Sequence, residues 1–142
     1  MIPAYNAAET IGRVVSKCFR KAPRCVVIDD GSTDGTANEA ARAGADVIIH
    51  TRNRGKGAAL QSALGCLADE EFTWMVILDA DGQHEPGEMG RLVHVAQRDK
   101  ADFVCGNRMN NPKNMPPLRQ WTNRVTSRIT SWLCGTTLHD SQ

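Results

Sequence analysis

The chain has 142 residues, of which 41% are hydrophobic and 23% charged, and its formal net charge is +1. These values are typical of one globular domain. The near-neutral charge, the single tyrosine and the three phenylalanines argue against nucleic-acid binding. The longest apolar stretch, residues 74–78, is far too short to span a bilayer. The five cysteines are odd in number and lack CxxC spacing, which argues against a zinc site or a disulfide framework and favours a reducing compartment, the cytoplasm.

Short apolar runs alternate along the chain with longer helical patterns. In chain order, the predicted elements are the end of a strand at residues 2–3, a helix at 8–21, a strand at 25–28, a helix at 36–43, a strand at 47–50, a helix at 56–68, a strand at 74–78, a helix at 86–97, a strand at 103–105, a loop at 110–117 and a helix at 119–133. This alternation predicts an α/β fold with a mostly parallel sheet flanked by helices. The short first strand and the abrupt end at residues 139–142 indicate one domain over residues 1–142 that is truncated at both ends, with its C-terminal part absent.

An acidic motif follows the predicted strand at residues 74–78, at the sheet edge where α/β proteins gather ligands. Asp79 and Asp81 are two residues apart, and carboxylates at this spacing can share one hard cation that prefers oxygen ligands. Gln83 could add a carbonyl oxygen, and the cation could bridge and stabilise a diphosphate leaving group. Because Asp and Gly are also common turn residues, a plain turn is the alternative interpretation.

A second acidic segment, residues 29–36 (DDGSTDGT), follows the strand at residues 25–28. One carboxylate at such a position, here that of Asp30, can accept hydrogen bonds from a base or a ribose. Asp34 or Thr36 is expected to cap the next helix, and a purely structural loop with a helix cap is the alternative for the whole segment.

Basic residues accompany the remaining predicted elements. Residues 53–57 (NRGKG) are not a Walker A loop, but a nucleotide phosphate could lie at the N-terminus of the helix that they precede; a glycine-rich turn with an exposed lysine is the alternative. Arg108, Arg119 and Arg124 offer guanidinium groups that suit phosphate oxygens. The acid-free stretch at residues 113–128 could meet phosphate or an anionic membrane, or be a solvated helix face. No role is given to three histidines without partners at metal-ligand spacing: His50, His94 and His139.

Six segments, taken together and in order, resemble family 2 glycosyltransferases of the GT-A fold, in particular the dolichyl- and polyprenyl-phosphate mannose or glucose synthases. They are residues 2–6 (IPAYN), 27–36 (VIDDGSTDGT), 53–57 (NRGKG), 79–84 (DADGQH), 106–108 (GNR) and 140–142 (DSQ). The resemblance implies an inverting, Mg- or Mn-dependent transfer of sugar from a nucleoside-diphosphate sugar, of the GDP-mannose or UDP-glucose type, to a polyprenyl or dolichyl phosphate. It also implies work at the cytoplasmic face of a membrane, and oligomer formation is compatible with it.

The resemblance implies roles for individual residues. The nucleotide sugar would be bound by Pro3, Ala4, Tyr5, Asp29, Asp30, Lys56, Asp79, Ala80 and Asp81. Within this set Asp30, with Asp29 beside it, would hold the base and the ribose. The implied metal ligands are Asp79, Asp81 and Gln83. The implied catalytic residues are Asp79 and Asp81 on the donor side and Arg108 and Arg119, with Asn123 near them, on the side of the acceptor phosphate.

Two departures from the family pattern stand out. The family usually has an acidic residue where this chain has Ala7, which puts donor affinity or identity in question, although Glu9 could compensate in part. Relatives also continue beyond residues 140–142, so the acceptor half of the site could be incomplete.

Two other functions remain open. The first is a family 2 transferase that glycosylates a saccharide or small-molecule hydroxyl, for which Asp140 could be the base. The second is a nucleotide-binding module without activity. A dinucleotide-binding Rossmann enzyme is disfavoured, because no GxGxxG follows the first strand.

Overall fold

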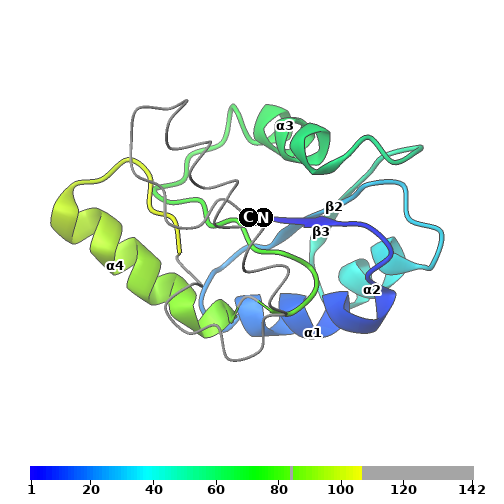
Figure 1. The fold of residues 1–142 in the computed structure, drawn as a ribbon, viewed down its shortest axis with the longest axis horizontal. Coiled ribbons are helices and arrows are strands. Elements are labelled where there is room, and N and C mark those ends of the chain that lie inside the picture. Colours follow the sequence, from blue (N-terminus) through cyan, green and yellow to red (C-terminus); the bar gives the residue numbers. More distant parts are fainter. Residues whose placement is uncertain (84, 107–142) are drawn as a thin grey trace, which may run out of the picture. The chain divides into compact units, whose positions relative to one another are not determined.

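The computed structural model describes residues 1–83 and 85–106 (Figure 1). The chain divides into two compact units, Met1–His94 and Val95–Gln142. The elements are β1 (Ile2–Ala4), α1 (Ala8–Cys18), β2 (Val26–Asp29), α2 (Thr36–Arg42), β3 (Asp46–Ile49), α3 (Lys56–Cys66), the 3₁₀ turn η1 (Pro86–Glu88) and α4 (Met89–Asp99). The order of strands and helices predicted from the sequence is confirmed for all of these elements. In the part of the chain that the structure describes, no helix combines the length and the apolar character needed to cross a membrane.

The three strands form one parallel sheet in the order β1-β2-β3, with Val27 opposite Ile2 on one side and Val47 on the other. Helices α1 and α2 lie on one side of this sheet and α3 on the other (Figure 1). Val27 packs with residues of α1, whereas its neighbour Ile28 packs with Ala59 and Ala63 of α3. Every residue of β2 is therefore buried, which explains its uninterrupted apolar run.

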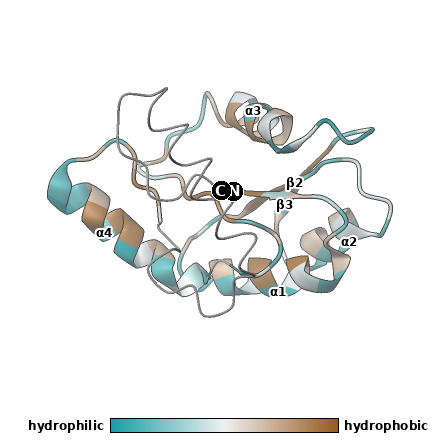
Figure 2. Ribbon diagram, in the orientation of Figure 1, coloured by the Kyte–Doolittle hydropathy of each residue, from teal (hydrophilic) through white to brown (hydrophobic). Residues whose placement is uncertain are grey.

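Helix α1 buries the apolar stripe that its sequence predicts. Ile11, Val14, Val15 and Cys18 are buried, and Figure 2 shows hydrophobic and hydrophilic residues alternating along this helix. A polar residue beside this stripe, Thr10, hydrogen-bonds to the loop that follows segment 74–78.

The predicted strand at residues 74–78 is only partly formed. The backbone nitrogen of Met1 donates to the Val76 carbonyl at 2.9 Å, and the Leu78 nitrogen donates to the Met1 carbonyl at 3.1 Å. The next residue on this edge of β1 is Pro3, which has no N–H to continue the ladder. The segment therefore runs beside β1 with two hydrogen bonds, and the structure assigns it no strand.

The predicted strand at residues 103–105 is wrong, because residues 103–106 have no regular structure. Phe103 is 80% exposed, and no strand among the described residues pairs with it. A run of three apolar residues becomes a strand only where a partner strand satisfies its backbone groups. The predicted loop at residues 110–117 and the predicted helix at 119–133 lie outside the described residues.

Candidate functional site

A pocket of about 730 Å³ opens at the carboxyl ends of the strands. It is formed by β1 and the residues that follow it, by the loop after β2, by the first residue of α3 and by the residues that follow segment 74–78. Its lining residues are Pro3, Tyr5, Asn6, Ala7, Glu9, Thr10, Asp34, Lys56, Asp79, Ala80 and Asp81. Four segments that are distant in sequence, residues 3–10, 34, 56 and 79–81, thus meet at one place, which is the position where the sequence predicts ligand binding.

The Lys56–Asp79 ion pair lies in this pocket. Lys56 Nζ is 2.5 Å from Asp79 Oδ1, and the Lys56 side chain is 59% exposed. Lys56 is the first residue of α3, so its ammonium group stands at the positive end of a helix. Lysine and helix N-terminus together make this end of the pocket suitable for phosphate oxygens.

The second acid of the motif, Asp81, is exposed, and its side chain accepts a hydrogen bond from the backbone of its own loop. Asp81 Oδ1 accepts the N–H of Gln83 at 2.8 Å, which is the turn that the sequence offered as the alternative. Gln83 does not line the pocket. Among residues 1–83 and 85–106, no group of three His, Cys, Asp or Glu side chains is placed to hold a metal ion.

A divalent cation nevertheless fits the donor set at this place. Asp79 and Asp81 supply carboxylate oxygens at the pocket wall, which are the ligands that Mg²⁺ and Mn²⁺ prefer. Mg²⁺ is commonly held by one or two carboxylates, with water and substrate phosphates completing its shell. Two protein carboxylates suffice for a cation that arrives with a diphosphate.

Two side chains of helix α1 bind the loop that carries these acids. Thr10 Oγ1 donates to the Ala80 carbonyl at 2.7 Å, and Lys17 Nζ is 3.1 Å from Glu85 Oε2. These side chains are seven residues apart, two turns along one side of α1. The loop between them, residues 80–85, is therefore held at both ends.

Asp34 connects the starts of two helices. Its Oδ2 accepts the N–H of Ala8, the first residue of α1, at 3.0 Å. Its Oδ1 accepts the N–H of Thr36, the first residue of α2, at 3.1 Å and the Thr36 hydroxyl at 2.5 Å. The hydrogen bonds from Thr36 and Ala8 lower the pKa of Asp34. Asp34 thus accepts the first N–H of both helices, but the expected N-cap at Asp34 or Thr36 is wrong, because the N-cap of α2 is Gly35 and Asp34 acts from the residue before it.

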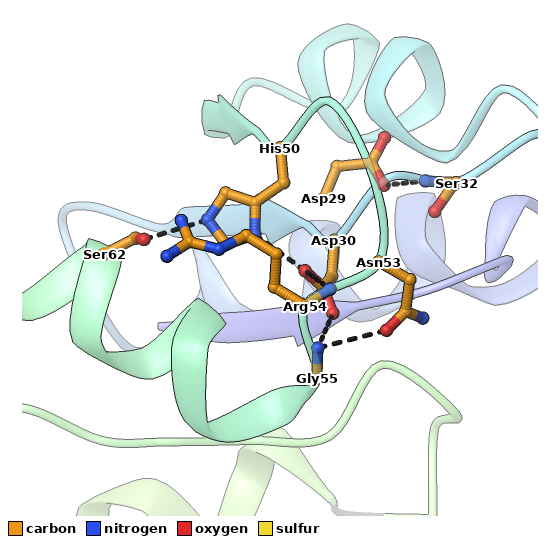
Figure 3. Close-up of polar contacts among 8 residues, drawn as sticks. All are labelled: Asp29, Asp30, Ser32, His50, Asn53, Arg54, Gly55 and Ser62. Atoms are coloured by element: carbon orange, nitrogen blue, oxygen red, sulfur yellow. Dashed lines mark hydrogen bonds and ion pairs between the residues drawn. The ribbon is translucent and has the colours of Figure 1, made fainter.

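Asp29 and Asp30 are buried and hydrogen-bond to neighbouring loops (Figure 3). Each is 4% exposed, and neither lines the pocket. Asp29 Oδ1 accepts the N–H of Ser32 at 2.9 Å, which turns the chain out of β2. Asp30 instead accepts hydrogen bonds from His50 Nδ1 at 2.6 Å, from the Arg54 N–H at 3.0 Å and from the Gly55 N–H at 2.7 Å. Their predicted contacts with base and ribose stay predictions.

His50 is the residue that sequence reasoning missed. It is 8% exposed, and its Nε2 lies 2.9 Å from Ser62 Oγ of α3 while its Nδ1 faces Asp30. Asp30 is 20 residues away and Ser62 is 12 residues away, so no local spacing links the three. The sequence feature that could have indicated a role for His50 is its position directly after the apolar strand residues 47–49.

Most of the expected donor-site residues come together. The pocket is lined by Pro3, Tyr5, Lys56, Asp79, Ala80 and Asp81, whereas Ala4 is buried and does not line it. Ala7 and Glu9 line it as well, so Glu9 offers a carboxylate two residues from the place where Ala7 lacks one. The residues expected at the acceptor phosphate lie outside the described residues: Arg108, Arg119 and Asn123.

Residues 1–140 match the family model described as "Glycosyl transferase family 2". The chain is 31% identical over 151 residues to polyprenol monophosphomannose synthase of Mycolicibacterium smegmatis, covering 99% of the chain and 57% of that protein. It is 30% identical over 163 residues to UDP-N-acetylglucosamine–dolichyl-phosphate N-acetylglucosaminyltransferase of Methanococcus voltae, covering 100% of the chain and 65% of that protein. The chain thus spans about three fifths of the length of these relatives.

A solved structure shares the fold. The crystal structure of Mycobacterium tuberculosis glucosyl-3-phosphoglycerate synthase superposes with a TM-score of 0.53 at 26% identity, covering 65% of this chain and 37% of that one. The predicted α/β fold of the GT-A type, with a parallel sheet flanked by helices, is confirmed.

Proposed function

The chain belongs to glycosyl transferase family 2, and on this premise we propose that it transfers a sugar from a nucleoside-diphosphate sugar to a polyprenyl or dolichyl phosphate. Both relatives described above are named for polyprenol or dolichyl-phosphate products or acceptors. A lipid acceptor would bring the protein to the cytoplasmic surface of a membrane, and association into oligomers is compatible with this reaction.

One observation carries the proposal: Lys56, Asp79 and Asp81 meet in a single pocket at the carboxyl ends of the strands. A nucleoside diphosphate carries concentrated negative charge, which needs a cation and fixed N–H donors around it. The pocket supplies an ammonium group at a helix N-terminus and two carboxylates for a divalent ion. The aromatic ring of Tyr5, which is 50% exposed, offers a surface against which a base can stack.

Asp79 and Asp81 would hold Mg²⁺ or Mn²⁺ together with the diphosphate, and Gln83 stays a predicted third ligand. When bound, the ion supplies charge neutralisation for the departing diphosphate. Lys56 orients the diphosphate through its ammonium group. The hydrogen bond from Thr10 to the Ala80 carbonyl holds the loop that carries Asp79 and Asp81 in position.

The proposed acceptor simplifies the protein's task. A lipid phosphate is already anionic near neutral pH, so its oxygen attacks the anomeric carbon directly, the bond to the diphosphate breaks, and the configuration inverts. No side chain has to remove a proton. The protein's contribution is positioning and charge stabilisation, which Lys56 provides on the donor side. On the acceptor side, we propose that Arg108 and Arg119 bind the phosphate.

The test is a transfer assay with UDP-glucose or GDP-mannose as donor, polyprenyl phosphate as acceptor and Mn²⁺ present. We expect Asp81→Ala to lower metal-dependent turnover by at least about a hundredfold. Asp69→Ala removes an exposed carboxylate that does not line the pocket, and it should leave the rate unchanged. Full turnover of Asp81→Ala would reject the assignment.

A second candidate is supported by the solved relative, which is named for a phosphoglycerate product. In this alternative the acceptor is a hydroxyl of a small phosphorylated molecule, and Asp140 would be the base. Turnover with 3-phosphoglycerate but not with polyprenyl phosphate would favour it. Donor binding without turnover on any acceptor would favour a nucleotide-binding module.

A further inference from the structure

We infer that Thr36 and Ser32 are positioning residues, which fix the chain between β1 and α1 and thereby hold the ring of Tyr5 for the base of the nucleotide. The inference deepens the proposed function and rests on it, because Tyr5 is the residue proposed to stack against that base. The hydroxyl oxygens of Thr36 and Ser32 accept hydrogen bonds from the backbone that follows Tyr5, and these contacts are the means by which they act.

The first support is the way in which the start of α1 is bound. The backbone N–H groups of three consecutive residues, 6–8, each donate to a side-chain oxygen of the loop after β2. The acceptors are, in that order, Ser32 Oγ at 2.9 Å, Thr36 Oγ1 at 2.8 Å and Asp34 Oδ2 at 3.0 Å. Tyr5 lies directly before these residues, so the direction in which its side chain leaves the backbone depends on them.

The second support is the N-terminus of α1 itself. Ala7 is the N-cap of this helix, and alanine has no side-chain oxygen to accept a hydrogen bond there. The acceptors come instead from Thr36, which is 0% exposed, and from Asp34. The Thr36 hydroxyl accepts the Ala7 N–H and donates to Asp34 Oδ1 at 2.5 Å. A buried hydroxyl that both accepts and donates keeps one orientation, so it fixes the backbone at Ala7.

The third support is the conformation of Asn6. Its φ of 49° lies in the left-handed region, which residues other than glycine seldom adopt and asparagine adopts more readily than most. Its N–H donates to Ser32 Oγ, and its side-chain Oδ1 accepts the N–H of Thr33 at 2.9 Å. A backbone conformation of this kind persists where the contacts around it fix it. Loosening Asn6 would therefore give freedom to its neighbour, Tyr5.

The first experiment observes the ring of Tyr5 without any nucleotide. Tyr5 is the single tyrosine of the chain, so incorporation of 3-fluorotyrosine gives one ¹⁹F resonance that reports this ring. Thr36→Val keeps the shape of the side chain and removes its hydroxyl, whereas Thr36→Ser keeps the hydroxyl and loses a methyl group. We expect Thr36→Val to shift or broaden the resonance and Thr36→Ser to leave it in place. Ser32→Ala, at a partly buried position, should also shift or broaden it and provides the test should Thr36→Val fail to fold.

The matched control for Thr36→Val is Thr73→Val. It makes the same chemical change at an exposed residue before segment 74–78, and it should leave the resonance unchanged. An unchanged resonance in both Thr36→Val and Ser32→Ala would overturn the inference. Equal changes in Thr36→Val and Thr36→Ser would overturn it for Thr36, because packing and not the hydroxyl would then be responsible.

The second experiment measures coupling to the ligand, using the Kd for UDP and GDP in the presence of MnCl₂. Tyr5→Leu removes the aromatic ring and should raise the Kd by about tenfold, because base stacking is lost. Thr36→Val should raise the Kd by about threefold to tenfold, and the double variant should resemble Tyr5→Leu alone. Multiplication of the two effects would overturn the inference, because Thr36 would then act independently of the ring. Failure of the unaltered chain to bind either nucleotide would count against the proposed function, while the ¹⁹F experiment would still decide whether Thr36 and Ser32 hold Tyr5.

Discussion

Lys56 Nζ lies 2.5 Å from Asp79 Oδ1, and this ion pair joins the first residue of α3 to the residue that directly follows segment 74–78. The two side chains are 59% and 25% exposed, so water screens the pair. Pairs of this kind contribute only about 0–1 kcal/mol to stability. The Lys56–Asp79 contact therefore contributes little to the stability of the fold, and under the proposed function it arranges charge around the diphosphate.

The first prediction follows from that distinction. Lys56→Ala should change the free energy of unfolding by less than about 1 kcal/mol. It should also weaken binding of UDP or GDP with Mn²⁺ by about tenfold, because a cationic group opposite the phosphates is lost. Urea unfolding and calorimetry measure the two effects. Arg42→Ala, which breaks the exposed Arg42–Glu39 pair on α2, serves as the control and should alter neither strongly.

The second prediction concerns the close approach of two loops. Gly31 has a φ of +74°, and a Cβ added there would lie 2.6 Å from the Asn53 nitrogen and closer still to the Arg52 carbonyl carbon. Gly35 has a φ of +86° with open space around it. Gly35→Ala should cost about 1–2 kcal/mol from backbone strain alone. Gly31→Ala should cost at least about 2 kcal/mol more, because it adds a backbone clash. Equal destabilisation of the two variants in denaturant titrations would contradict this reading of the contact.

The sequence predicted those parts of the fold that depend on local pattern. The stripe from Ile11 to Cys18 has one helical period, and the run ending at Asp29 is apolar because helices cover both sides of β2. The acids at Asp79 and Asp81 could be located because they follow an apolar run directly. Such features depend on residues close together in the chain.

The sequence could not reveal contacts that tertiary structure creates. His50 meets Asp30 and Ser62 only after β2, β3 and α3 have assembled, so it was given no role. The strand at residues 74–78 was expected in full, but Pro3 on its neighbour lacks the N–H that would extend the ladder. The run at residues 103–105 has strand-like composition and no partner strand among the described residues.

The third prediction is a pH dependence at Asp34. Its pKa is lowered by hydrogen bonds from Thr36 and Ala8, so its stabilising effect is fully present above the ordinary value of 3.8 and is lost as the pH falls through the lower folded-state pKa. Asn at this position keeps one acceptor oxygen and places an NH₂ group against an N–H donor. Asp34→Asn should therefore lower the melting temperature at pH 7, and its difference from the unaltered chain should shrink below about pH 4. A difference that stays constant from pH 7 to pH 3 would show that the charge of Asp34 is not involved.

The fourth prediction tests how α1 supports the acidic loop. Thr10 Oγ1 donates to the Ala80 carbonyl at 2.7 Å, between the two carboxylates of Asp79 and Asp81. Thr10→Val keeps the shape of the side chain and removes the donor, at a cost of about 1 kcal/mol in stability. Because the Ala80 carbonyl then loses its partner, the loop should gain freedom and the affinity for Mn²⁺ with nucleotide should fall by about threefold to tenfold.

Ser16→Ala is the matched control for Thr10→Val. Ser16 also donates a hydroxyl to a backbone carbonyl, that of Gly12, but within α1 and on an exposed side of the helix. Loss of the Ser16 hydroxyl should leave the affinity for Mn²⁺ with nucleotide unchanged. If Thr10→Val destabilises the chain yet binds Mn²⁺ and nucleotide as tightly as Ser16→Ala does, the Thr10–Ala80 contact stabilises the fold without positioning the site. If it loses affinity while Ser16→Ala does not, α1 acts as a support for the carboxylates in addition to covering the sheet.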